Sequence, residues 1–183
     1  MRFAPAAAVV IVLAAVNARA TVLVPMDLNE LAAAAHAVVY ARITEVRPVV
    51  TDDRRRVESI VVAEAIGYMK GDLGRAIMFR IPGGQVGAYR TVMVGAPSFE
   101  RGDEVILFFG ARPPALPYIV GFSQGVYRVR IDERTGARVV VPPPAINTGD
   151  TVRLARGTRT PMALDAFAAR VRALATAPAR GAR

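Results

Sequence analysis

Residues 104–109 read Glu-Val-Ile-Leu-Phe-Phe, and the run Val105–Phe109 contains no polar residue. A strand with one solvated face would alternate apolar and polar residues, so this run predicts a strand that is buried on both faces. It follows the turn Arg101-Gly102-Asp103, and a proline-rich loop comes after it. We therefore expect this strand to form part of the hydrophobic core.

Segments that alternate apolar and polar side chains lie on both sides of this run. Ala37–Val46 reads AVVYARITEV and places Val39, Ala41 and Ile43 on one face of a predicted strand. Further strands are predicted over 56–69, 75–81, 118–122, 125–131 and 138–141, with a ribbon over 85–94. Short strands with frequent turns favour a mainly β fold, an OB-like antiparallel barrel, closed or partly open, of about five to seven strands, with a β-sandwich as the alternative.

A helix is predicted at each end of the strand region. Asp27 and Glu30 have the spacing of a capping box, which predicts a short helix that ends near His36. Thr160 can cap a second helix, with Pro161 at its first position. That helix would pack on the barrel through an apolar stripe of Leu164, Phe167, Val171 and Leu174.

The first twenty residues have the layout of a cleavable secretory signal. Arg2 precedes the apolar run Ala4–Val16, and Ala18-Arg19-Ala20 has the small-x-small pattern that signal peptidase recognises. The run is too short to cross a bilayer, so we expect export to the periplasm or the extracellular space, and no transmembrane span after Thr21. The expected divisions are a signal over 1–20, a barrel domain over 21–145, a linker over 146–160, a helix over 161–176 and a tail over 177–183.

The residue types that are absent exclude several kinds of chemistry. The chain has no cysteine, which excludes disulfides, thiolate catalysis, zinc–thiolate sites and a bacterial lipoprotein anchor. His36 is the single histidine, so a metal site with several histidines is impossible. We therefore assign no metal and no cofactor to this chain.

The formal net charge is +9, which raises the possibility of nucleic-acid binding. The arginines are scattered along the chain, however, and do not cluster with aromatic residues as they do in nucleic-acid-binding proteins. The charge is better interpreted as a solvated basic surface that attracts anionic polymers weakly. We expect no specific nucleic-acid partner.

Several short motifs together resemble a group of uncharacterised bacterial exported proteins. They are Lys70-Gly71, Gly83-Gly84, Gly95-Ala96-Pro97 followed by Phe99, and Gly102-Asp103-Glu104, within a match over about Leu28–Val129. This resemblance implies no particular function.

The first half is also distantly similar to the netrin-like domain of tissue inhibitors of metalloproteinases. There too a helix leads into an apolar strand, and a long strand ends in Lys-Gly, as at Lys70-Gly71. The similarity implies an OB-like barrel. Those inhibitors bind the target's zinc through an N-terminal cysteine, which this chain lacks, so their mechanism does not carry over.

The sequence favours neither of two catalytic or ligand-binding interpretations. Gly83–Gly87 resembles a phosphate loop, but a β-rich segment follows it where a phosphate loop would open a helix. His36 could act as a base for Ser98 or Ser123, but neither serine lies in a Gly-x-Ser-x-Gly turn. We therefore assign no catalytic residue.

The sequence favours an exported, non-enzymatic binding or accessory domain. Loops on a rigid β-scaffold usually carry recognition, and the glycine-rich segment 83–97 is the best candidate here. Its expected contact residues are Gly83, Gly84, Gln85, Tyr89 and Arg90. The partner would be a protein or polymer of the envelope or the extracellular space. The alternative is an envelope protease inhibitor or a hydrolase.

Overall fold

The computed structural model describes residues 24–53, 56–110, 116–143 and 160–176. The expected signal 1–20 and tail 177–183 lie outside the described residues, as does the linker 146–160 apart from its last residue. The described chain is mainly β with two α-helices, which confirms the expected fold class. No helix within these ranges is long and apolar enough to cross a membrane.

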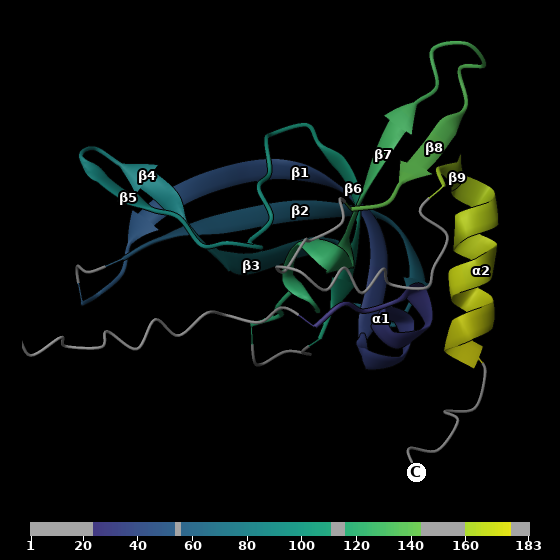
Figure 1. Cartoon of the computed structure of the whole chain (residues 1–183), viewed down its shortest axis with the longest axis horizontal. Helices are drawn as coiled ribbons and strands as arrows, with labels where there is room; N and C mark the ends of the chain where they lie inside the picture. The colour runs from purple at the N-terminus through teal and green to yellow at the C-terminus, as the bar shows by residue number, and fades with distance from the viewer. Residues whose placement is uncertain (1–23, 54–55, 111–115, 144–159, 177–183) are drawn as a thin grey trace, which may run out of the picture.

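Seven strands form one antiparallel sheet (Figure 1). They are β1 (Ala37–Val50), β2 (Val57–Lys70), β3 (Ala76–Pro82), β6 (Glu104–Phe109), β7 (Val126–Ile131), β8 (Arg138–Val141) and β9 (Met162–Ala163). Their order across the sheet is β3-β2-β1-β6-β7-β8-β9, so the apolar strand β6 has neighbours on both sides. The predicted ribbon after β3 is a separate two-stranded hairpin of β4 (Gly84–Val86) and β5 (Tyr89–Thr91).

The sheet is strongly curled. The ring centroids of Phe79 on β3 and Phe109 on β6 are 5.1 Å apart, although two strands lie between them in the sheet. A flat sheet would separate β3 from β6 by roughly 14 Å. Three register irregularities between β1 and β2 allow this bend, because bulges increase local twist and curvature.

The curled sheet is nevertheless not closed into a barrel within the described residues, which corrects only the closed form of the expected barrel. The outer strands β3 and β9 do not pair with each other within the described residues. Phe99, which follows the hairpin, fills the concave side and packs edge-on against Phe79 with ring centroids 5.7 Å apart. The sheet thus buries its concave face through its own curvature and through this loop.

Both faces of β6 are buried, as its sequence predicts. Val105, Leu107 and Phe109 join the concave cluster together with the apolar face of β1. Ile106 and Phe108 join the cluster on the other face, where the two helices pack.

The first helix, α1 (Leu28–Ala34), has the predicted capping box. The Glu30 N–H donates to Asp27 Oδ1 at 2.8 Å, and the Asp27 N–H donates to Glu30 Oε2 at 2.7 Å. Two backbone donors at the start of the helix are therefore satisfied by side chains.

The second helix, α2 (Leu164–Thr176), begins three residues later than predicted. Met162–Ala163 is extended because it pairs with Val139 and Val140 of β8 as the last strand of the sheet. This pairing replaces the helix start expected at Pro161. Phe167 and Val171 are buried against the sheet, as the apolar stripe predicts.

The strand predicted over 118–122 is reduced to one bridge between Ile119 and Phe109. Gly121 and Phe122 adopt left-handed backbone angles, with φ of 66° and 55°, and a 3₁₀ turn, η1 (Phe122–Gly125), follows. The Gln124 side chain in this turn accepts from the Met26 N–H at 2.7 Å. This bond holds the segment before α1 against the end of the sheet.

Candidate functional site

The first candidate site is the β4–β5 hairpin with the segment Val92–Val94 that follows it. The hairpin lies at the far end of the long β1–β2 pair, on the opposite side of the molecule from α2 (Figure 1). Recognition residues placed there are held by the longest strands of the sheet.

Three hydrogen bonds attach the hairpin to β2. The Val57 N–H donates to Thr91 Oγ1 at 2.7 Å, the Gly83 N–H donates to the Val57 carbonyl at 3.0 Å, and Ser59 Oγ donates to the Gly83 carbonyl at 2.8 Å. The β1 and β2 strands therefore determine the position of the hairpin.

The Gly-Gly pair is explained by a close approach to the sheet. Gly84 has φ of 138°, and a Cβ there would lie 2.9 Å from Ser59 Oγ and 3.1 Å from Pro48 Cβ. Only glycine fits this backbone without strain. Gly83 and Gly84 are half-buried and attach the hairpin to the sheet, whereas Gln85, Tyr89 and Arg90 are exposed.

The structure adds to Tyr89 an exposed apolar segment, Val92–Val94, that the sequence pattern did not single out. Val92 and Val94 are 73% and 84% exposed, and Met93 and Tyr89 are also exposed. The sequence pattern predicts a ribbon over 85–94, but Val92–Val94 lie outside both strands of the hairpin. The signal that could have found them is an apolar run next to Gly95 and Pro97, which end a strand.

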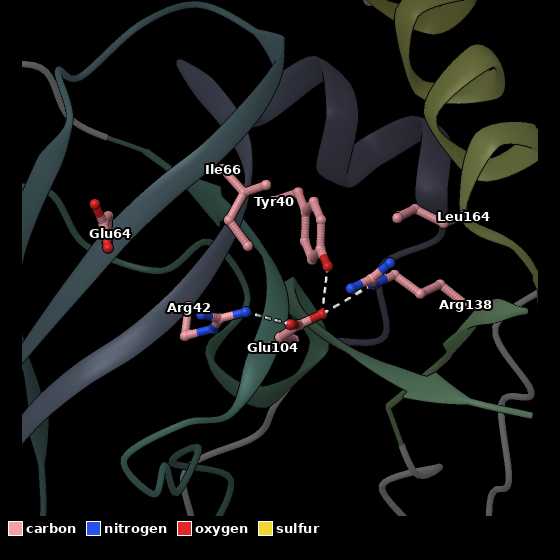
Figure 2. Close-up of a pocket in the computed structure, with 7 residues that line it drawn as sticks. All are labelled: Tyr40, Arg42, Glu64, Ile66, Glu104, Arg138 and Leu164. Atoms are coloured by element: carbon pink, nitrogen blue, oxygen red, sulfur yellow. Dashed lines mark hydrogen bonds and ion pairs between the residues drawn. The ribbon is translucent and has the colours of Figure 1, made fainter. Parts of the chain in front are cut away.

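The second candidate site is a pocket of about 290 Å³ on the face of the sheet that carries the helices (Figure 2). Four strands and the start of α2 line it, with Tyr40, Arg42, Glu64, Ile66, Glu104, Arg138 and Leu164. No sequence motif points to this group, because its members are up to 124 positions apart in the chain, from 40 to 164.

The Glu104 carboxylate is the centre of this pocket. It accepts hydrogen bonds from the Tyr40 hydroxyl, from Arg42 Nη2 at 2.9 Å and from Arg138 Nε at 3.3 Å (Figure 2). The Tyr40 hydroxyl, followed by the Arg42 guanidinium, lowers the pKa of the Glu104 carboxyl below its usual value. Burial, together with the bond to Glu104, raises the pKa of Tyr40. Glu104 is therefore held as a carboxylate.

We expect the Glu104→Gln variant to lose less of its free energy of unfolding than the wild type does as the pH falls. The pKa of Glu104 is lower in the folded chain than in the unfolded chain, so its contribution is present above the unfolded pKa. That contribution is lost as the pH falls through the folded pKa. Urea unfolding between about pH 6 and pH 3 measures the slope, which should be steeper for the wild type. Parallel profiles for the two proteins would contradict this assignment.

The residues considered for catalysis have structural contacts of their own. His36 is exposed and lies just beyond α1, which ends at Ala34, and its backbone N–H donates to the Phe109 carbonyl at 2.6 Å. The Ser98 carbonyl accepts from Arg128 Nη2 at 2.7 Å, and the Ser123 N–H donates to the Gly95 carbonyl at 3.0 Å.

No hydrogen bond within the described ranges joins His36 to Ser98 or to Ser123. In the same part of the chain, no group of three or more histidine, aspartate or glutamate side chains is placed to hold a metal ion.

Comparison of the chain with family models, with curated proteins and with solved structures gives no match.

Proposed function

We propose that this chain is an exported binding domain without catalytic activity, and that it holds an envelope protein through the β4–β5 hairpin and Val92–Val94. The observation that carries this proposal is the exposed apolar surface of Tyr89 and Val92–Val94 on a hairpin that is tied to the sheet. Burial of apolar surface contributes a favourable free energy of roughly 25 cal/mol per Å². A partner that covers this exposed surface would therefore gain binding free energy from it.

The side chains of this surface match the composition of protein interfaces. Tyrosine and methionine are enriched in interface cores, and Tyr89 and Met93 lie within four positions of each other here. A rigid scaffold also lowers the entropy that is lost on binding, and the bonds from Val57 and Ser59 supply this rigidity.

The charge of the hairpin itself favours a partner with an acidic rim. Arg90 on β5 is exposed and is the only charged residue in the segment 84–94. Complementary charge at the rim of an interface raises the association rate and selects the partner. Export is supported by the signal-like layout of residues 1–20.

We expect the double substitution Val92→Ser, Val94→Ser to weaken capture of the partner by about tenfold or more, because each change removes apolar surface from the interface core. The mature chain, beginning at Thr21, is immobilised and exposed to envelope extract, and captured proteins are quantified by mass spectrometry. Neither valine is buried, so the melting temperature should stay near that of the wild type.

Ile131→Ser is the matched control, because Ile131 is 65% exposed but lies on β7, outside the hairpin. It should leave capture unchanged. Equal capture by the double variant and the wild type, or an equal loss in the Ile131 variant, would refute the hairpin as the contact surface.

A further inference from the structure

The pocket around Glu104 forms where the helix layer ends and the sheet continues. Tyr40 and Leu164 pack against the core beneath the helices, whereas Ile66 on β2 is half-exposed beside them. Arg42 and Arg138 reach Glu104 from two sides (Figure 2). The pocket therefore combines an apolar wall with two cationic groups.

The two arginines retain capacity for a further ligand. Their side chains are 54% and 52% exposed. Arg42 donates through Nη2 and Arg138 through Nε to the shared Glu104 carboxylate, and each guanidinium carries five N–H donors. Donors on both groups can thus reach a second acceptor while Glu104 stays bound.

The charges within the pocket leave one positive charge unbalanced. Glu104 offsets one of the two arginines. Glu64, at the edge of the pocket, is already bound by Arg75, whose Nε and Nη2 donate to Glu64 Oε1 at 3.1 and 2.9 Å. One added carboxylate would make the group neutral, with two guanidiniums and two carboxylates.

We propose that this pocket binds a small monocarboxylate with a short apolar chain, its carboxylate on Arg42 and Arg138 and its apolar part on Ile66 and Leu164. Guanidinium groups recognise carboxylates through paired, charge-assisted hydrogen bonds. The volume of about 290 Å³ lies at the lower end of ligand pockets and suits a small molecule.

Titration of the mature chain with hexanoate, followed by two-dimensional NMR, tests the proposal. Saturable shifts are expected at the pocket residues. Arg42→Gln and Arg138→Gln should each raise the dissociation constant by about tenfold, because each removes a charge-assisted donor. Arg42→Lys keeps the charge but loses the planar guanidinium group. Its dissociation constant for hexanoate should therefore lie between those of Arg42→Gln and the wild type.

Arg80→Gln is the matched control, since Arg80 lies on β3 of the same sheet, its side chain is 56% exposed, and neither Arg80 nor its ion-pair partner Glu58 lines the pocket. It should leave hexanoate binding within about twofold of the wild type, the size of a distant surface-charge effect. Thermal melts of all variants separate loss of binding from loss of folding.

Titrations with acetate and with inorganic phosphate, compared with hexanoate, test which class of ligand the pocket prefers. Acetate should bind about fivefold or more weakly than hexanoate, because it lacks the apolar chain, and Ile66→Ser should narrow that difference. The proposal is overturned if hexanoate gives no saturable shift, if both glutamine variants bind it normally, or if acetate or phosphate binds as tightly as hexanoate.

Discussion

Leu107→Ala should lower the free energy of unfolding by about 2–5 kcal/mol, the usual range for a leucine in a packed core. Leu107 is fully buried in the concave cluster and lies opposite Val39 of β1 and Val126 of β7. A methyl-sized side chain at this position would leave a cavity that strands on both sides prevent from closing. Urea unfolding followed by circular dichroism measures the loss.

Ile131→Ala provides the comparison, because that side chain is largely exposed near the end of β7. Its free energy of unfolding should stay within about 0.5 kcal/mol of the wild type. A loss below about 0.5 kcal/mol for Leu107→Ala as well would mean that β6 is peripheral, and the position of this strand in the sheet would need revision.

Gly71→Ala is expected to destabilise the fold by more than about 2 kcal/mol, because strain and a steric clash act together. Gly71 has φ of 61°, and a Cβ there would lie 2.4 Å from the His36 carbonyl oxygen and 3.2 Å from Ala37 Cα. Both contacts are backbone atoms at the start of β1, so neither can rotate away. The preceding Lys70 donates from Nζ to the Ala32 carbonyl at 2.7 Å. The Lys-Gly pair thus joins the end of β2 to the end of α1.

Gly136→Ala separates the strain of the left-handed backbone from the effect of the steric clash. Gly136 has a similar φ of 69°, but a Cβ there would meet no atom within 4 Å. Its substitution should cost only the strain of a left-handed residue, about 1–2 kcal/mol. Equal losses at Gly71 and Gly136 in parallel urea titrations would show that the approach to His36 is not important for stability.

Local patterns in the sequence predicted most of the elements correctly. The run Val105–Phe109 predicts a strand with two buried faces, and both of its faces are buried. The spacing of Asp27 and Glu30 predicts a capping box, which forms. These features depend on neighbours within a few positions of the chain, so periodicity and capping rules are sufficient to find them.

Predictions that depended on distant pairing were less accurate. Met162–Ala163 joins the sheet and not the helix, because β8 supplies a partner for its backbone groups. The strand expected over 118–122 is interrupted where Gly121 takes a left-handed conformation and η1 follows. In the first segment a tertiary contact outweighs the local preference, and in the second the turn leaves only the bridge between Ile119 and Phe109.

The candidate sites also combine features that the local sequence predicts with features that only the tertiary structure shows. The sequence pointed to the glycine-rich segment 83–97, because Gly-Gly beside alternating residues marks a turn on a β-scaffold. It did not show that Val92–Val94 would be exposed, because exposure depends on how the curled sheet leaves the segment uncovered.

By itself, the sequence determined the mainly β composition, the strand β6 with two buried faces, and the absence of cysteine chemistry. Only the tertiary structure decided the curvature that brings Phe79 to Phe109, and the meeting of Tyr40, Glu104 and Arg138 in one pocket. The physical reason is that strand order and bulges set the distance between residues far apart in the chain. Periodicity shows which way a side chain faces, but not which strand lies beside it.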